Sequence, residues 1–510
     1  YKDLIRGDWF EPKGRPHHTG AVYLNGDWLI EASKLDEVLN FSGTPAWLKE
    51  AGLGAPTAQL WFAQVDATNT AIWAQFKGVN PNEQNVEINV RQTVFYPGEP
   101  GRNFITVRGF VMEQAATPWA PPTAEQIALV GTHWSKGWII ESNVVRYSIC
   151  SGISLGKYGD RWDNTSANSA EGYVETIKRA LANGWNRDTI GHHLVRNNVI
   201  SHCEQAGIVG SLGAAFSTVT GNHISDIHVR RLFTGAEMAG IKFHAAIDTV
   251  IRNNDIERTC LGLWLDWMAQ GTRVSANLFH DNGRDLFVEV NHGPFVVDNN
   301  LFLSGANLLD MSEGGAYAHN LFNGTIINSP ELNRQTPYHP AHSTSIAGLA
   351  NVKGGDCRFY NNLFVGRGGT SANDSGCGLA SYNRREVPLQ TGGNVFYCGA
   401  QPYAHESNGT VTSTFDPQLK LLRQNDRLSL RFNPGIDLKQ SKTRPVETAR
   451  LGKAQVSGLP YENADGSPFK VDLDFLGQPR SKSTPTPGPF EHPKSARLIL
   501  PGRGLAGLTN

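Results

Sequence analysis

Short stretches of alternating apolar and polar residues recur along most of the chain, and many copies begin with an Asn. In Asn277-Leu278-Phe279 and Asn300-Leu301-Phe302 the Asn precedes an apolar pair. The copies from Asn254 to Asn320 are almost evenly spaced, whereas Asn143 and Asn198 lie much further apart. A short repeat of this kind, made of short strands, indicates a solenoid with insertions between some coils. The repeated residues are Asn143, Asn198, Asn222, Asn254, Asn277, Asn300, Asn320, Asn362 and Asn394.

A second apolar phrase follows the first within several coils, as in Gly207-Ile208, Gly240-Ile241 and Gly262-Leu263. Two or three strands per coil, joined by turns that carry Asn or Gly, are typical of a parallel β-helix. The skeleton of a leucine-rich repeat is absent. We therefore predict an all-β fold, a right-handed parallel β-helix. We expect its Asn residues to occupy a left-handed turn position and to stack in a hydrogen-bonded ladder.

The N-terminal part of the chain, before the repeat, has a different pattern of apolar and polar residues. Two apolar runs flank the pair Asn25-Gly26, which predicts a hairpin with a type I′ turn. Further strands are expected at 60–65 and 71–76, so this part is predicted to be a small, immunoglobulin-like β-sandwich. The predicted organisation is a lead-in segment 1–14, a β-sandwich insertion domain 15–85, a β-helix domain 86–440 with an inserted loop and helix at 157–190, and a C-terminal tail 441–510 that packs on the β-helix.

Composition narrows the classes of partner. The chain has 46 basic and 47 acidic residues, a formal net charge of -1, and no long run of one sign. Neither nucleic acid nor a membrane is expected as a partner. The first residues lack the apolar core of a secretory signal, so a cytoplasmic location is expected. The sequence leaves open a homo-oligomer.

Two acidic residues occupy equivalent positions in consecutive coils. Asp266 follows Asn254 at the same distance along the sequence as Glu289 follows Asn277. They should therefore be neighbours in one parallel sheet, whose strands lie about 4.8 Å apart. Retaining glycosidases hold two carboxyl groups about 5 to 5.5 Å apart, whereas inverting enzymes need a wider gap. This register favours a retaining glycosidase.

The residues around these acids suit a sugar site. Side chains alternate along a strand, so Trp264 and Phe287 should share the outer face with Asp266 and Glu289. Trp264, Trp267 and Phe287 then offer faces on which a sugar ring stacks. Two acids without a cation between them repel, which raises the pKa of at least one, as a general acid requires.

The preceding coil adds two polar candidates with the same outward parity. Lys242 and His244 lie within reach of sugar hydroxyls, although Lys242 could equally form an ion pair with the acids. Asp310 is a candidate to extend the acidic row by one coil. The alternative interpretation is that outward acids on a solenoid are solvated surface groups.

Several of these segments closely resemble glycoside hydrolase family 120, the β-helical β-xylosidases. They include Gly240-Ile241-Lys242-Phe243-His244, Gly262-Leu263-Trp264-Leu265-Asp266-Trp267 and Phe287-Val288-Glu289-Val290-Asn291-His292. The resemblance implies that Asp266 is the nucleophile and Glu289 the acid/base. It also implies that Glu237 and Trp9 bind substrate, beside Lys242, His244, Trp264 and Trp267.

The function expected on these grounds is a retaining, exo-acting β-xylosidase. It would release xylose from xylobiose and short xylo-oligosaccharides by double displacement. No cofactor and no metal at the site are expected, while a structural calcium ion is left open. Two alternatives are a β-helix polysaccharide lyase, which typically relies on Lys or Arg with calcium, and a non-catalytic carbohydrate-binding solenoid.

Overall fold

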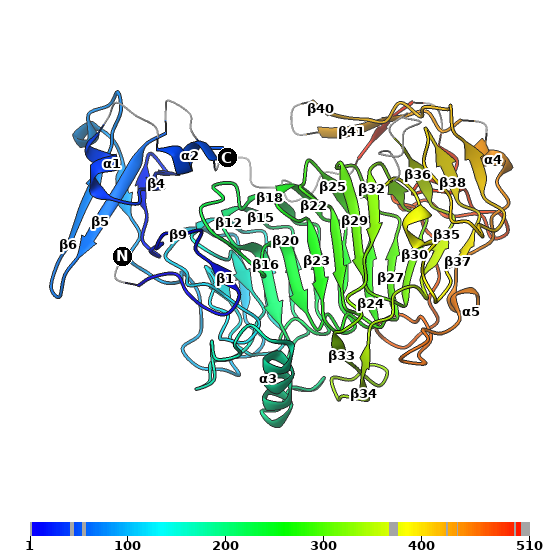
Figure 1. The fold of residues 1–510 in the computed structure, drawn as a ribbon, viewed down its shortest axis with the longest axis horizontal. Helices are drawn as coiled ribbons and strands as arrows, with labels where there is room; N and C mark the ends of the chain where they lie inside the picture. Colours follow the sequence, from blue (N-terminus) through cyan, green and yellow to red (C-terminus); the bar gives the residue numbers. More distant parts are fainter. Residues whose placement is uncertain are drawn as a thin grey trace.

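Most of the chain winds into a right-handed parallel β-helix, as predicted (Figure 1). The computed structural model describes residues 3–40, 45–50, 52–53, 58–366, 376–424, 427–435, 437–493 and 496–500. Each complete coil contributes one strand to each of three parallel sheets, named A, B and C below. One coil, for example, runs through β22 (Asp255–Thr259), β23 (Leu263–Asp266) and β24 (Thr272–Ser275).

Sheet A contains eight strands among the described residues. Its long, well-paired central strands carry the candidate site. The eight strands of sheet A are, in order, β10 (Val130–Gly131), β13 (Ile153–Ser154), β16 (Ala206–Ser211), β20 (Ala239–His244), β23, β26 (Leu286–Glu289), β29 (Ala306–Met311) and β32 (Thr325–Asn328).

Sheets B and C complete the walls of the coil. Sheet B consists of β8 (Thr106–Arg108), β11 (Ile139–Glu141), β14 (Leu194–Arg196), β17 (Thr218–Thr220), β21 (Val250–Arg252), β24, β27 (Phe295–Asp298), β30 (Gly315–Ala318), β35 (Arg358–Tyr360) and β37 (Gln390–Gly392). Sheet C consists of β9 (Val111–Ala115), β12 (Val144–Ser148), β15 (Val199–Cys203), β18 (His223–Ile227), β22, β25 (Leu278–His280), β28 (Leu301–Phe302), β31 (Leu321–Phe322), β36 (Leu363–Val365), β38 (Val395–Tyr397) and β39 (Thr410–Thr412).

The repeated Asn residues form the predicted ladder between sheets B and C. Nδ2 of Asn254 donates to Oδ1 of Asn277 at 3.0 Å, and Asn277 donates in the same way to Asn300. The left-handed position was predicted one residue too late. In this coil it belongs to Asn253, with φ 57°, immediately before the ladder residue. The side chain of each ladder Asn instead forms hydrogen bonds with buried backbone and side-chain groups. These hydrogen bonds fix the register of successive coils.

The inside of the coil is packed by side chains that repeat at the same strand position. Phe279, Phe302, Phe322, Phe364 and Phe396 form a stack with ring centroids 4.9 to 5.2 Å apart. All five are at most 1% exposed. Such a continuous column makes each coil depend on its neighbours, as expected of a solenoid.

The N-terminal region holds two small sheets, which agrees with the predicted sandwich. Strands β3 (Asp27–Trp28), β2 (Val22–Leu24) and β7 (Val86–Ile88) form one, and β4 (Ile30–Glu31), β5 (Leu60–Val65) and β6 (Thr70–Ala74) the other. Asn25 and Gly26 both have positive φ, which confirms the type I′ turn. Because β7 pairs with β2, this region extends slightly past its predicted end. Its helices are α1 (Leu35–Leu39) and α2 (Ala46–Glu50).

Two insertions project from the same side of the β-helix (Figure 1). One is α3 (Ala170–Ala182), whose N-cap Ser169 accepts a hydrogen bond from the Gly172 amide. It lies within the predicted insertion at 157–190 and buries Tyr173 and Ile177. The other is the antiparallel hairpin of β33 (Gln335–Tyr338) and β34 (Gly348–Asn351).

The C-terminal part packs on the coils, whose last strand is β39. After β39 the chain forms an antiparallel sheet of β40 (Lys420–Gln424), β41 (Arg427–Phe432) and β42 (Ala496–Ile499). The Arg423 guanidinium anchors this sheet on the Glu257 carboxylate of β22 at 2.7 Å. Two short helices, α4 (Asp437–Gln440) and α5 (Thr448–Leu451), lie between β41 and β42 in the sequence.

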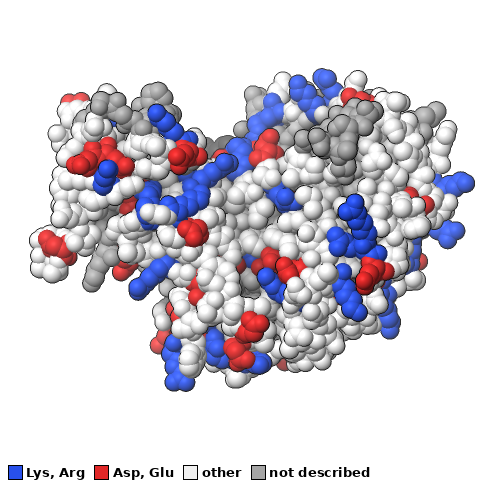
Figure 2. All heavy atoms as spheres, in the orientation of Figure 1, with Lys and Arg blue, Asp and Glu red and all other residues white. Residues whose placement is uncertain are grey.

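The surface agrees with the balanced composition. Figure 2 displays acidic and basic side chains interspersed over one face. None of the helices in the described part of the chain combines the length and apolar character needed to span a bilayer.

Candidate active site

The two predicted acids end neighbouring strands of sheet A. Asp266 is the last residue of β23 and Glu289 the last of β26, and the two strands pair in parallel with these residues directly opposite each other. The register counted from the Asn repeat is thereby confirmed. Adjacent parallel strands lie about 4.8 Å apart, so both carboxyl groups address the same small volume.

Alternation along the strands places these acids on the outer face. Leu263 and Leu265 of β23 point into the hydrophobic core of the coil and are fully buried. Trp264 shares the outer face with Asp266, and its ring stacks on Phe287 with centroids 4.9 Å apart. The two aromatic rings are 8% and 9% exposed, so they form a wall of the site rather than a fully open surface.

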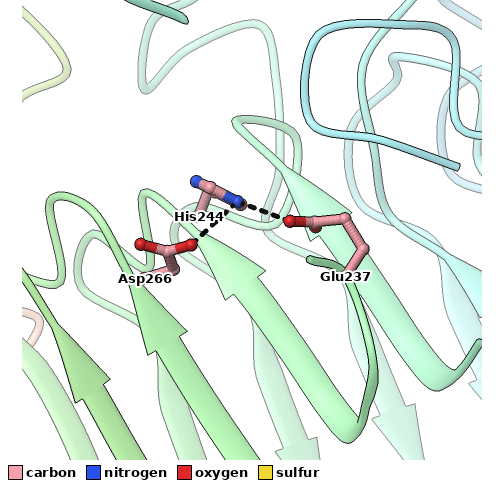
Figure 3. Close-up of side chains that lie close together, drawn as sticks. All are labelled: Glu237, His244 and Asp266. Carbon is pink, nitrogen blue, oxygen red and sulfur yellow. Dashed lines mark hydrogen bonds and ion pairs between the residues drawn. The ribbon is translucent and has the colours of Figure 1, made fainter. Parts of the chain in front are cut away.

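Glu237, His244 and Asp266 converge on one point beside this wall (Figure 3). The Nζ of Lys242 lies 2.7 Å from Oδ2 of Asp266, 3.1 Å from Oε1 of Glu237 and 3.0 Å from Nε2 of His244. Burial alone would lower the pKa of Lys242, but Asp266 and Glu237 outweigh it and raise that pKa. The lysine is therefore a buried cation held by two carboxylates.

Of the two roles that the sequence leaves open for Lys242, the structure shows the ion pair with the acids. The lysine is fully buried and does not line the cavity described below, so contact with sugar hydroxyls stays a prediction. The repulsion expected between acids without a cation is relieved at Asp266, which the ammonium contacts directly. The physical reason is that Glu237 and Asp266 require a compensating charge once they are removed from water.

Glu237 and His244 remain at the site. Burial opposes ionisation of Glu237, but Lys242 and His244 outweigh it and hold the pKa of Glu237 below its usual range. His244 lies 3.0 Å from Oε1 of Glu237 and packs edge-on against the ring of Tyr173. Both residues line the cavity described below. Their role in binding substrate stays a prediction.

Glu289 differs sharply from Asp266 in its surroundings. Burial, and then the nearby charge of Asp266, raise the pKa of Glu289 to about 8. Lys242, Arg334 and a hydrogen bond from Trp264 act in the opposite direction without cancelling this shift. Nε1 of Trp264 donates to Oε2 at 3.1 Å, and the Arg334 guanidinium lies 3.3 Å from Oε1. Glu289 thus holds a proton near neutral pH.

Two buried carboxylate oxygens at the site have no hydrogen-bond partner among the described residues. They are Oδ1 of Asp266 and Oε2 of Glu237, whereas the other oxygen of each group is bound by Lys242. A buried acceptor without a partner is costly and therefore uncommon. Each of these oxygens therefore has unused capacity to accept a hydrogen bond.

The same three residue types could in principle hold a metal ion. Suitable atoms of Glu237, His244 and Asp266 lie within 4.8 Å of one another. The Lys242 ammonium lies within 3.1 Å of a side-chain atom of each, so it already supplies the positive charge at that point. A divalent cation would have to displace or deprotonate this lysine, and the donor set therefore fits a lysine-centred cluster better than a metal centre.

A cavity of about 360 Å³ opens over these groups. Trp9 reaches it because β1 (Phe10–Glu11) pairs with β19 (Thr234–Gly235) immediately before Glu237. The predicted residues that line the cavity are Trp9, Glu237, His244, Trp264, Asp266, Trp267, Phe287 and Glu289.

Other residues at the site were not predicted. Tyr173 of α3 and Arg334 before β33 also line the cavity, and both come from insertions between coils. The unusually long interval between Asn320 and Asn362 was the signal for the second insertion, but its fold could not be read from the period.

Asp310 does not extend the acidic row. It pairs with Val288 rather than Glu289, so its side chain points into the coil. There it is fully buried, and the Tyr382 hydroxyl donates to its Oδ2 at 2.6 Å. The next residue, Met311, occupies the position opposite Glu289 and ends the polar series.

Comparison with known proteins agrees with this geometry. The family model of the glycoside hydrolase 120 insertion domain matches residues 1–88, and that of the right-handed β-helix region matches residues 168–364. The solved structure described as the complex structure of XylC with xylose is 39% identical, with a TM-score of 0.91. The match covers 98% of this chain and 83% of that chain.

More distant structures contribute less. One described as a glycoside hydrolase is 13% identical, covering 53% of this chain and 55% of that chain with a TM-score of 0.38. No curated protein matches the chain. The insertion-domain match and the identity to XylC over nearly the whole chain establish the family, which also sets aside the lyase and the non-catalytic solenoid. The chain belongs to glycoside hydrolase family 120 and is a glycoside hydrolase.

Proposed function

We propose that this protein is a retaining, exo-acting β-xylosidase that releases terminal xylose from xylobiose and short xylo-oligosaccharides. The xylose in the structure of the XylC relative supports the choice of sugar, at 39% identity. The observation that carries the mechanism is the direct pairing of Asp266 with Glu289 on adjacent strands. Neighbouring strands suit the short carboxyl separation of retaining enzymes.

In the first step, Oδ1 of Asp266 attacks the anomeric carbon of the terminal sugar. The C–O bond to the leaving group breaks as the new bond forms, and Glu289 gives its proton to the departing oxygen. Lys242 holds Oδ2 of Asp266 at 2.7 Å, which fixes the carboxylate and leaves Oδ1 free to react. The raised pKa of Glu289 supports its role as the acid.

In the second step, Glu289 has become a carboxylate and removes a proton from water. The water oxygen attacks the anomeric carbon from the face the leaving group vacated, and the bond to Asp266 breaks. Two inversions give net retention. Glu237, through its unpartnered Oε2, is proposed to accept a hydrogen bond from a sugar hydroxyl. Trp9, Trp264 and Trp267 form the apolar sides of the sugar site.

The test combines substrate choice with stereochemistry. Aryl β-xyloside, arabinoside and glucoside are compared for hydrolysis, and the first-formed anomer is followed by NMR. We expect the xyloside to have the highest kcat/KM and β-xylose to appear before the α-anomer. Asp266→Asn and Glu289→Gln should each lose nearly all hydrolysis of xylobiose while remaining folded. Full activity in either variant, or first release of α-xylose, would contradict the proposal.

A further inference from the structure

The acid marks where the leaving group departs. Along sheet A, β23 with Asp266 and β26 with Glu289 are direct neighbours. In the proposed reaction the sugar that is attacked lies within reach of Asp266. The glycosidic oxygen of the leaving group lies within hydrogen-bond reach of Glu289, because an acid has to be close to the oxygen it protonates.

A groove adjoins the catalytic cavity at Arg334, which contacts Glu289. It lies between α3 and the β33–β34 hairpin and has a volume of about 750 Å³. Ala170 and Arg334 line both the groove and the cavity, so the two spaces join at the mouth beside Glu289. The two walls, α3 and the β33–β34 hairpin, project on the same side of the coils (Figure 1). The groove is about twice the volume of the 360 Å³ cavity, so if the cavity takes one sugar, the groove has room for more than one.

The lining of the groove suits a neutral chain with many hydroxyl groups. Val174 and Leu349 provide apolar surface, and Leu349 is 45% exposed. Asn333 and Asn351 add side-chain amides, which can donate and accept hydrogen bonds. A surface that mixes small apolar areas with such groups matches the alternating faces of a sugar chain.

The charges in the groove disfavour an anionic chain. Glu171, Glu175 and Glu331 line it, against the two cations Lys178 and Arg334. Lys178 is held by Glu175 at 2.7 Å, and Arg334 lies beside the protonated Glu289. The three carboxylates outnumber the two cations, so the net charge of the groove lining is negative.

We infer that this groove binds the leaving-group part of a linear, neutral xylo-oligosaccharide, with two or more units beyond the scissile bond. The inference rests on the proposed function, whose cavity it extends. It assigns specificity for chain length to α3 and the β33–β34 hairpin, two insertions outside the regular coils.

The wild-type protein gives the first test. We expect kcat/KM to rise several-fold from xylobiose to xylotetraose, because added units gain contacts in the groove. An enzyme that cleaves xylobiose and xylotetraose equally well would overturn the groove assignment alone. Failure to cleave any β-xyloside would refute the proposed function itself, and the groove assignment with it.

Variants in the groove give the second test. Glu171→Ala combined with Leu349→Ala should lower kcat/KM for xylotetraose about 5- to 20-fold, mainly through KM. Hydrolysis of an aryl β-xyloside, which has no chain to place in the groove, should stay within about twofold. The matched control is Leu473→Ala, a leucine of similar exposure at 50% that lies away from this groove.

Two outcomes would overturn the inference. One is an equal loss on the aryl xyloside and xylotetraose, and the other is no loss on either substrate in a folded variant. A substrate with a glucuronic acid branch on its leaving-group side checks the charge argument. Cleavage of this substrate faster than of its unbranched counterpart would contradict a groove for neutral chains.

Discussion

The Nζ of Lys242 lies 2.7 Å from Oδ2 of Asp266, while Oδ1 of the same carboxylate has no hydrogen-bond partner in the described part of the chain. One oxygen is thus held by a buried cation, and the other is the one proposed to attack the sugar. Glu289, one strand further on, has its proton retained by burial. Two acids in equivalent positions of a repeat therefore have different surroundings, which support the different roles proposed for them.

Replacing the buried lysine should damage both stability and activity. In Lys242→Met, Glu237 and Asp266 lose the ammonium that both contact, and breaking a buried ion pair costs about 3–5 kcal/mol. Because Lys242 also lowers the pKa of Glu289, the alkaline limb of the kcat/KM profile should move to higher pH. Denaturant unfolding and a pH profile measure these effects. Lys178→Met, which removes an exposed ion pair with Glu175, is the control and should cost less than about 1 kcal/mol.

The raised pKa of Glu289 has a consequence for folding. Its pKa of about 8 in the folded protein exceeds the usual 4.5, so the folded state binds the proton more tightly than the unfolded state does. The favourable contribution of the neutral form is complete below about pH 4.5 and is lost as pH rises towards 8.

Glu289→Gln, which stays neutral, should therefore be more stable than the wild type at pH 8, by about 2–5 kcal/mol. The difference should shrink as pH falls towards 4.5. Denaturant unfolding of the variant and the wild type at the two pH values measures this difference. The measurement does not depend on hydrolytic activity, which the variant is expected to lack. The same difference in the free energy of unfolding between variant and wild type at both pH values would show that Glu289 is not held protonated by the fold.

The hydrogen bond from Trp264 to Glu289 should set the upper pH limit of activity. Its Nε1 donates to Oε2 and favours the ionised acid. In Trp264→Phe an aromatic ring remains, but the donor is lost, so the pKa of Glu289 should rise by up to about one unit. The alkaline limb of kcat/KM should move up accordingly. Movement to lower pH, or an unchanged limb, would contradict this role of the indole.

The Asn ladder should be a major source of stability. Asn254 accepts from the Asn222 amide and donates to Oδ1 of Asn277 and the Val219 carbonyl, all buried. Asn254→Ala leaves these groups without partners and should cost about 2–5 kcal/mol in the free energy of unfolding. Arg252→Ala, an exposed change on the same coil, should cost less than about 0.5 kcal/mol. Equal effects of the two changes would mean that the ladder contributes little.

The sequence predicts the coils and the acid pair because a solenoid repeats its geometry. A constant offset from the ladder Asn is sufficient to place Asp266 opposite Glu289. The same offset fails one coil on, because the coil between Asn300 and Asn320 is shorter. Counted from Asn300 it falls on Ser312, whereas the residue opposite Glu289 is Met311 and Asp310 lies opposite Val288.

The remainder of the site depends on contacts that the spacing of the repeat along the sequence does not determine. Arg334 and Tyr173 come from insertions whose path depends on tertiary packing. The burial of Lys242 among Glu237, His244 and Asp266 depends on side-chain direction, whereas alternation specifies only a face. These are the features on which the roles proposed for Asp266 and Glu289 depend.

The proposed mechanism requires Asp266 to form a covalent bond to the sugar. A 2-deoxy-2-fluoro-xyloside with a good leaving group forms the first intermediate faster than the intermediate hydrolyses, so mass spectrometry of the treated protein detects this bond directly. We expect one added fluoroxylosyl group on the peptide that contains Asp266, and none on the Asp266→Asn variant. A label on another carboxylate, or turnover with inversion and no labelled protein, would contradict it.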